Sequence, residues 1–486
     1  MQVDSFLFVL VFLPVVVFLY HAFGKNKMRY KKGLLVICSL LFYSYSGCKS
    51  AAVLICSLGI NIVICVFLKK STTAHITNFI LATGIVLNLL LLGYLKYTNF
   101  IIQNINAFWN LSITEKTIIL PAGISFFTFQ QIMFIIYYAR NGEKNIGFVD
   151  YLVYVLYFPK LLMGPLVDPK SFLNELQTVR GVDYRSIVEG IQRIVVGLFK
   201  KVIVAEAMIN AVEWGSNYIS ESTALDLIIV SFAYTMQIYF DFCGYSDIAI
   251  GVSKMFNIYL PNNFDSPYRA TSISDFWRKW HISLTNFLTD YVYIPLGGNR
   301  KGRARTYFNI LIVFLVSGIW HGANWTFIVW GIIYGMLMVV EKLLCRQINR
   351  IPKIIGRIYT LSIVNILWMF FWLDSIDDVL YAITKIWKGV FSGSWVISES
   401  LKQCFLTKEM SAMIYLLNND YISNHGTSLA MIVVVGVSTI ICQFPINSNN
   451  IKYKANTRTV FTTVILATWC FISMSVRTAG FIYSGF

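Results

Sequence analysis

Apolar segments separated by short polar or basic connections recur along the whole chain. Segments such as 6–23, 76–95 and 459–476 approach the ~20 residues with which a helix crosses the hydrocarbon core of a bilayer. Backbone polar groups in lipid must bond within their own segment, which favours helices there. The pattern therefore predicts an all-α polytopic membrane protein, with one domain over residues 1–486.

The composition agrees with a membrane protein. Of 486 residues, 57% are hydrophobic and 13% charged, and the mean hydropathy is +0.63, unlike a soluble domain. The net charge of +16 would suggest nucleic-acid binding in a soluble protein, but here the basic residues lie in the short connections, as the positive-inside rule describes. We therefore expect no nucleic-acid partner. The nine cysteines stand singly without a CxxC pair, so we expect neither a metal site nor a disulfide framework.

The basic connections also indicate the orientation of the chain. Lys25 and Arg29 follow the first apolar segment, so we expect this connection in the cytoplasm and the N-terminus outside. Lys452 and Lys454 precede the last apolar segment, so we expect that connection in the cytoplasm too. The C-terminus, after this last segment, is then expected outside. The interval 374–426 is the longest polar segment, and we expect it to be external as well.

Two apolar segments contain residues that interrupt a helix. LPAGISFFTFQQI (120–132) carries a proline, a glycine and two glutamines, and YFPKLLMGPLVDP (157–169) carries prolines and Gly164. Such segments are tolerated at membrane depth where they pack inside protein or line a polar cavity. We therefore expect re-entrant segments around an internal cavity. Asp241 and Asp247, in another apolar segment, are functional candidates because a carboxylate at this depth is costly.

The stretch 275–325 holds two of the five histidines, both beside tryptophans. Ser274 is a suitable cap for a helix in which Trp277 and His281 recur at helical spacing. We expect an amphipathic helix at the cytoplasmic interface, with Arg278 on another of its faces. His281 either bonds to backbone on the interfacial face or takes part in catalysis.

A glycine-rich basic loop follows, PLGGNRKGRAR (295–305). Backbone amides near its glycines, together with Asn299 and Arg300, are suited to hold phosphates. The loop is not a Walker motif, because GxxxxGK[ST] is absent.

His321 lies in SGIWHGANW, between two apolar segments. A histidine is expensive to bury in a membrane and titrates near neutral pH, which suits a general base. The alternative is a histidine that only packs helices together. Asn324 is close enough in sequence to orient His321 or to bind substrate. GxSxG, HExxH and paired acids are absent, so serine-hydrolase, zinc-protease and glycosidase mechanisms have no support.

These motifs, together with GLFKKVIVA, YFDFCGYSDIAIG and the terminal FIYSGF, resemble those of the membrane-bound O-acyltransferase (MBOAT) family. The alginate O-acetyltransferase branch is the most similar. YIPLGGNR (293–300) distinguishes the chain from the D-alanyl transferase branch, while the interval 374–426 matches neither.

The resemblance implies a ring of tilted transmembrane helices with re-entrant segments around a central funnel, in the bacterial plasma (inner) membrane and surrounded by lipid. It also implies that His321 is catalytic and that His281 is the family's other characteristic histidine. We expect substrate contacts from Asn324, Trp320, Trp325, Trp277, Arg278, Asn299 and Arg300.

The implied reaction uses acetyl-CoA as the donor and no bound cofactor. An external partner acetyltransferase of the SGNH type then receives the acetyl group and modifies a polysaccharide such as alginate. One alternative is another acyl transfer in the same fold: D-alanylation of teichoic acid, peptidoglycan O-acetylation or lipid acylation. The other is a transporter that uses the broken helices and Asp241 as a substrate path.

Overall fold

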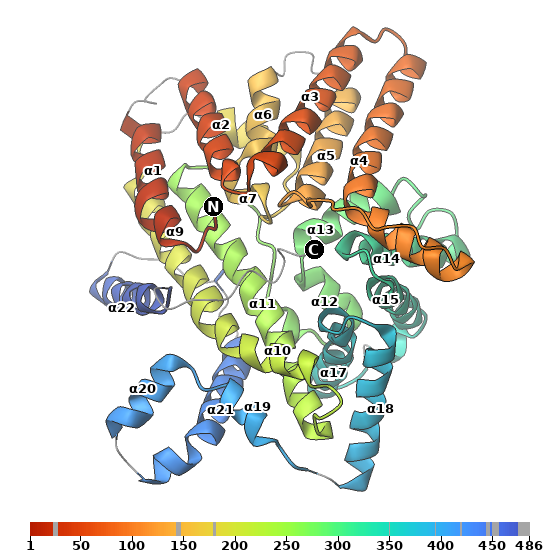
Figure 1. Ribbon diagram of the computed structural model, residues 1–486. Coiled ribbons are helices and arrows are strands. Elements are labelled where there is room, and N and C mark those ends of the chain that lie inside the picture. The colour runs from red at the N-terminus through yellow and green to blue at the C-terminus, as the bar shows by residue number, and fades with distance from the viewer. Residues whose placement is uncertain are drawn as a thin grey trace. The chain divides into compact units, whose positions relative to one another are not determined.

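The computed structural model describes residues 1–22, 28–141, 147–177, 181–348, 350–393, 395–417, 420–443, 448–449 and 456–474. Within these ranges the chain forms helices and no strand (Figure 1). Eight of the described helices are long and apolar enough to cross a membrane, which confirms the predicted all-α polytopic architecture. Lys25, Lys452, Lys454 and the terminal FIYSGF motif lie outside the described residues.

The packing of the described residues divides the chain into two compact units. Unit 1 contains residues 1–195, 245–261 and 456–464, and unit 2 contains 196–244, 262–449 and 465–474, apart from the undescribed gaps. The helices of unit 1 are η1 (Leu7–Phe12), α1 (Leu13–Ala22), α2 (Met28–Ser44), α3 (Cys48–Lys70), α4 (Ala74–Trp109), α5 (Ile124–Asn141), α6 (Phe148–Leu156), α7 (Phe158–Leu161) and α8 (Pro169–Gln177). Both units share α9 (Tyr184–Leu198), α11 (Ala224–Met255) and α22 (Thr457–Met474).

The described helices of unit 2 include four that span 18 or more residues along with shorter ones. They are η2 (Phe199–Ala205), η3 (Glu206–Met208), α10 (Ile209–Asn217), η4 (Pro267–Arg269), α12 (Ile273–Lys279), α13 (Ile282–Leu288), η5 (Thr289–Tyr293), α14 (Arg303–His321), α15 (Trp325–Leu343), α16 (Cys345–Ile348), α17 (Lys353–Trp372), α18 (Ile376–Ser392), α19 (Glu399–Cys404), α20 (Lys408–Leu417) and α21 (Asp420–Gln443).

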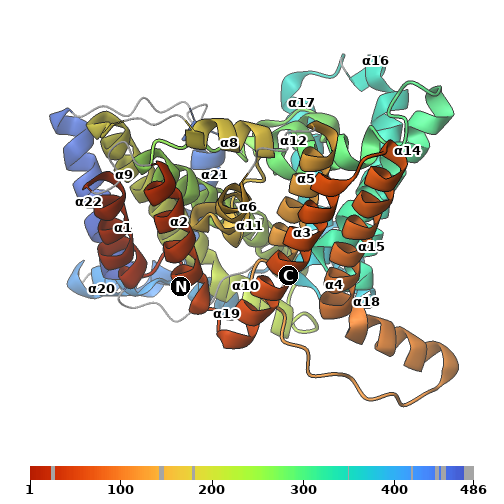
Figure 2. The ribbon, with the colours of Figure 1, turned by 90° about the horizontal axis from the view of Figure 1, so that it is seen from above.

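In unit 1, α3, α4 and α5 pack side by side (Figures 1 and 2). The α4 helix continues to Trp109, well beyond the predicted segment 76–95. Buried amides join the three helices: Asn61 and Asn88 exchange hydrogen bonds of 3.0 and 2.8 Å, and Asn61 also donates to Gln131. Because lipid offers no partners to these side chains, the bonds tie the three helices together.

The two helix-breaking segments are irregular in the structure and pack against each other. The α5 helix begins directly after a turn in which Gly123 adopts a φ of 71°. A Cβ at Gly123 would lie 2.9 Å from the carbonyl oxygen of Leu161, so both conformation and space require glycine. Beside these turns the buried Lys160 ammonium donates to Gln130 Oε1 and to the carbonyl oxygen of Tyr154 (2.5 Å). These breaks therefore pack inside the protein, and the internal cavity expected beside them stays a prediction.

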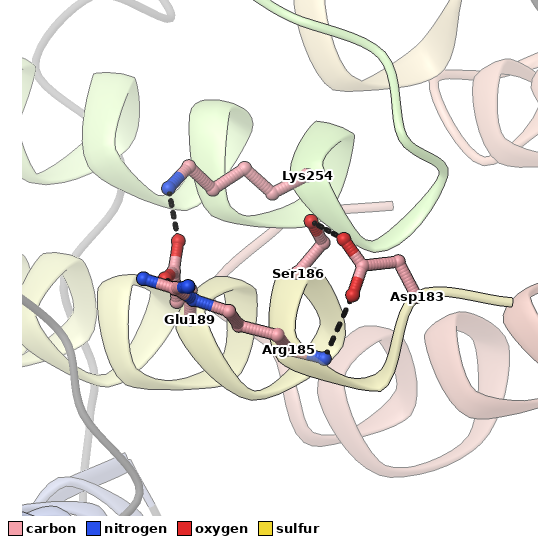
Figure 3. A network of polar contacts seen from close by, with 5 residues as sticks. All are labelled: Asp183, Arg185, Ser186, Glu189 and Lys254. Atoms are coloured by element: carbon pink, nitrogen blue, oxygen red, sulfur yellow. Dashed lines mark hydrogen bonds and ion pairs between the residues drawn. The ribbon is translucent and has the colours of Figure 1, made fainter. Parts of the chain in front are cut away.

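A polar network holds the start of α9 against the end of α11 (Figure 3). Asp183 caps α9, accepting hydrogen bonds from the backbone N–H of Arg185 (3.0 Å) and from Ser186 Oγ (2.7 Å). The bonds from Ser186 hold the pKa of the Asp183 carboxyl below its usual value. Glu189 accepts from Arg185 Nε (3.0 Å) and from Lys254 Nζ (2.9 Å). The network thus links the two helices within unit 1.

In unit 2, α14 and α15 run side by side with their backbones in contact (Figure 1). A Cβ at Gly318 would lie 2.4 Å from the carbonyl oxygen of Phe327, and one at Gly331 would lie 2.5 Å from a carbonyl oxygen of α14. Gly331 and Gly335 of α15 stand at GxxxG spacing, and both face α14 at close range. Because His321 is the last residue of α14, this contact determines where His321 lies along α15.

Two groups cap the N-terminus of α12. Ser272 Oγ accepts a hydrogen bond from the N–H of Asp275 at 3.0 Å. The buried carboxylate of Glu341, near the end of α15, accepts from the N–H groups of Ile273 (2.7 Å) and Ser274 (2.8 Å). The prediction of Ser274 as the cap is wrong, because Ser274 lies within the first turn and its N–H already bonds the Glu341 carboxylate.

The interval 374–426 is largely helical, with α18, α19, α20 and the start of α21. It is joined to the start of α11, where Asp226 Oδ1 accepts a hydrogen bond from the N–H of Ser398 at 3.0 Å. Large apolar side chains on α18 and α20 are exposed, among them Trp387, Phe391, Tyr415 and Leu416. The external position of this interval stays a prediction.

Gly331→Val is expected to lower the melting temperature of the purified protein in detergent. The new side chain would overlap a carbonyl oxygen of α14, and overpacking of this kind typically costs about 1–3 kcal/mol. Gly436→Val in α21 is the matched control, because a Cβ at Gly436 meets nothing within 4 Å. Equal losses in the two variants would contradict the close approach of α14 and α15.

Glu341→Ala is expected to destabilise the fold by about 1–3 kcal/mol, because two N–H groups of α12 would be left without their acceptor. Glu341→Gln keeps one acceptor oxygen and should lose less. Thermal unfolding in detergent measures both effects. An alanine variant as stable as the wild type would show that the carboxylate is not needed as a cap.

Candidate functional site

The stretch predicted as one interfacial helix forms two short helices. The first, α12, ends at Lys279, and α13 begins at Ile282. Between them His281 has φ 45° and ψ 51°, a left-handed conformation that histidine seldom adopts. The predicted continuous helix is wrong because the loop before α12 supplies hydrogen bonds at the break. The N–H of Asp265 donates to the carbonyl of Lys279, and the N–H of Ile282 donates to the carbonyl of Asn263, each at 3.0 Å.

Asn263 is the centre of a buried network around this break. Its Oδ1 accepts hydrogen bonds from the N–H of Ser283 (3.1 Å) and from Ser283 Oγ (2.9 Å), and lies 3.3 Å from His281 Nδ1. All three residues are buried. Burial lowers the pKa of His281 to about 3, so this imidazole is neutral at physiological pH.

Aromatic rings from two other helices enclose the imidazole of His281. The ring centroid of Phe242 in α11 is 4.7 Å away, and that of Trp320 in α14 is 6.1 Å away. The Trp320 ring is also 4.9 Å from His321. The structure therefore brings three predicted site residues together, with Trp320 next to both histidines.

His321 ends α14 and is buried, with 4% of its surface exposed. Trp330 of α15 and Phe371 of α17 lie 5.2 and 5.3 Å from it, between ring centroids. Trp277 of α12, another predicted site residue, is buried and lies 5.7 Å from Trp330. This aromatic shell keeps bulk water from His321, which strengthens any electrostatic interaction with a group bound beside it.

The remaining predicted site residues make other contacts. Asn324 caps α15: its Oδ1 accepts from the N–H of Thr326 (3.1 Å), and its Nδ2 donates to the carbonyl of Asp374 (2.8 Å). Trp325 is half exposed at the start of α15. The structure also leaves three polar candidates exposed, namely Arg278, Asn299 and Arg300. The substrate contacts expected of these residues stay predictions.

The glycine-rich basic loop is held on α14 by a buried amide. Gly297 and Gly298 have φ angles of 106° and 55°, and Asn309 Nδ2 donates to the carbonyl oxygen of Gly298 at 2.9 Å. Beside this turn the basic side chains are exposed: Arg300, Lys301, Arg303 and Arg305. Such a cluster is suited to bind phosphate groups. Among the described residues, no three His, Cys, Asp or Glu side chains lie close enough together to hold a metal ion.

The two carboxylates singled out from the sequence each pair with a buried cation. In unit 2, Asp241 pairs with Lys201, which lies in the π-helix η2. In unit 1, Asp247 lies 3.0 Å from the guanidinium of Arg193. In each pair the cation compensates the charge of the carboxylate. A role in holding helices together is therefore enough to explain both aspartates at membrane depth.

Sequence reasoning did not identify Asn263 or Glu341 as important. Glu341 carries a signal that could have found it, since it is a lone carboxylate at the end of an apolar segment. Asn263 carries no such signal, because an asparagine in a polar loop is ordinary.

Comparison with known proteins matches residues 138–382 to MBOAT, the membrane-bound O-acyltransferase family. The peptidoglycan O-acetyltransferase of Helicobacter pylori is 33% identical over 484 residues, covering 93% of this chain and 90% of that protein. The probable alginate O-acetylase of Azotobacter vinelandii is 33% identical over 427 residues, covering 85% and 83%. The teichoic acid D-alanyltransferase of Bacillus subtilis is 28% identical over 227 residues, covering 44% and 57%.

The family match contains both buried histidines, the capped α12 helix and the close α14–α15 pair. The first two relatives extend the similarity over most of the chain, and their names agree with acyl transfer. With its membrane-spanning helices, the chain is therefore a multi-pass O-acyltransferase that belongs to the membrane-bound O-acyltransferase family.

Proposed function

We propose that the protein transfers an acetyl group from acetyl-CoA in the cytoplasm towards a hydroxyl group of a glycan outside the bacterial plasma membrane. One observation carries the proposal: His281 and His321 are both buried beside Trp320 in a chain of this family. Acyl transfer to a hydroxyl requires a group that moves a proton, and an imidazole does this near neutral pH.

In this proposal His321 is the general base. Its ring removes the proton of the attacking hydroxyl while that oxygen adds to the thioester carbon. A C–O bond forms, the C–S bond breaks, and the imidazolium returns the proton to the departing thiolate, so the ring ends neutral. His281 and Trp277 contact the substrate from α12 and the break that follows it. Exclusion of water by the aromatic shell limits hydrolysis of the thioester.

The basic loop supports acetyl-CoA as the donor. Its exposed Arg300 and Lys301, with the further arginines at its end, favour the approach of a ligand that carries several phosphates. The N–H groups of Gly297 and Gly298 already donate to the carbonyl oxygens of Ile294 and Tyr293, each at 2.9 Å, so the basic side chains are the phosphate donors in this proposal.

Two acceptors are supported, each by a relative of the chain. An alginate-type exopolysaccharide is expected from the motifs and from relatives that align with 82–85% of the chain. Peptidoglycan as the acceptor is supported by the peptidoglycan O-acetyltransferase, which aligns with 93% of the chain. In both cases the acetyl group passes to an external SGNH-type partner, which modifies the glycan. D-alanyl transfer has less support, because that relative aligns with only 44% of the chain.

His321→Ala is expected to lower glycan O-acetylation in producing cells at least ~100-fold, the smallest loss typical of a missing acid–base group. His321→Gln keeps the size of the side chain but cannot carry the proton, so it should lower glycan O-acetylation to the same extent. Acetate released by mild alkali from separately purified peptidoglycan and exopolysaccharide measures the effect. The fraction that loses acetate identifies the acceptor.

His75→Ala is the control, because it removes an exposed histidine from α4. Immunoblots of the membrane fraction establish that each variant is present at wild-type abundance. Unchanged acetate in both glycans of a well-expressed His321→Ala strain would show that His321 is not the base.

A further inference from the structure

The contacts of His281 determine which of its ring nitrogens carries the hydrogen. Its Nδ1 lies 3.3 Å from Asn263 Oδ1, and both side chains are buried. An amide oxygen can only accept a hydrogen bond, so Nδ1 must be the donor. In the neutral imidazole the other nitrogen, Nε2, is then the acceptor.

Ser283 independently determines the orientation of the Asn263 amide. Its backbone N–H can only donate, and it lies 3.1 Å from Oδ1. The Ser283 hydroxyl donates to the same oxygen at 2.9 Å. If the amide were rotated, its NH₂ group would face a backbone donor, which is unfavourable. The oxygen of Asn263 therefore faces His281.

The backbone holds the imidazole against this oxygen. The Asn263 carbonyl accepts a hydrogen bond from the N–H of Ile282 at 3.0 Å, directly after the left-handed His281. Phe242 meets the imidazole edge to face, with an interplanar angle of 84°. Asn263 thus bonds the imidazole of His281 and also the N–H groups of Ile282 and Ser283, so it positions the ring and the backbone of this break together.

We infer that Asn263 is a positioning residue that keeps His281 in the neutral Nδ1–H form, with Nε2 as the hydrogen-bond acceptor offered to the substrate. The inference rests on the proposed function of this site. The group recognised by Nε2 is a hydrogen-bond donor of the substrate such as an amide N–H of the acyl donor, because the single hydrogen of the attacking hydroxyl goes to His321. His281 then orients the substrate, and proton transfer is left to His321.

Other charged groups surround this site, and most are already paired. On α11, Asp241 pairs with Lys201. On the segment of His281 itself, Lys279 pairs with Asp275 at 2.9 Å. The loop adds Asp265, and α14 adds the titratable His321. A carboxylate introduced at position 263 differs from all of these, because it would touch Nδ1 directly.

Asn263→Asp tests the inference. The carboxylate keeps the oxygen that accepts from Ser283 and His281, so the variant is expected to fold. Its charge should raise the pKa of His281 by about 1–3 units, from the value of about 3 produced by burial. Nε2 then binds a proton on the acid side and no longer accepts. Acetyl transfer should therefore fall more steeply on the acid side than in the wild type, in which only protonation of the base His321 limits it, and recover as the pH rises.

The measurement uses inverted membrane vesicles from producing cells, which retain the full chain and its partner. Radiolabelled acetyl-CoA is supplied on the exposed cytoplasmic face, and label in the glycan is followed across the pH range. Asn262→Asp places the same charge on the neighbouring, half-buried residue and should keep the wild-type pH profile. Asn263→Ala should lose activity at every pH, because the ring loses its partner.

The possible outcomes separate the inference from the proposed function. If wild-type vesicles transfer no label from acetyl-CoA, the proposed function fails. If the wild type is active and Asn263→Asp follows its pH profile at full activity, the positioning role is overturned. A uniform loss in Asn263→Asp, with lowered melting temperature and an unchanged pH profile, shows a purely structural asparagine and overturns it as well.

Discussion

The hydrogen bonds that Asn263 makes around His281 are the interaction on which the site depends. A break in a buried helix leaves N–H and carbonyl groups without their usual partners, at a cost of about 1–3 kcal/mol each. The loop before α12 supplies partners for Lys279, Ile282 and Ser283. The chain can therefore leave helical geometry at His281, and its imidazole packs between Phe242 and Trp320.

His321 reaches the same cluster through a steric constraint. Gly318 and Gly331 let the backbones of α14 and α15 touch, and this contact brings the end of α14 beside Trp330. The position of one histidine thus depends on hydrogen bonds to a loop, and that of the other on the absence of side chains between two helices. Trp320 is the shared neighbour, so a shift in either support changes the separation of the two imidazoles across this ring.

Local pattern was enough to predict the membrane helices, the helix-breaking segments and the burial of His321, because apolar length and residue type report burial directly. The break at His281 could not be predicted in this way. Its spacing from Trp277 is that of a continuous helix, while the competing partners come from a loop whose place depends on the tertiary fold. Asn324 shows the same limit: it is near His321 in sequence, yet its hydrogen bonds cap α15 and reach Asp374.

The different surroundings of the two histidines bear on the chemistry. Two imidazoles beside one indole would disturb each other's titration if both bound protons near neutral pH. Burial holds the pKa of His281 at about 3, and Asn263 accepts from its Nδ1, so this ring stays neutral. The proposed transfer moves one proton from a hydroxyl to a thiolate and needs one proton carrier. A ring with so low a pKa is a weak base, so in the proposed mechanism the proton carrier is His321.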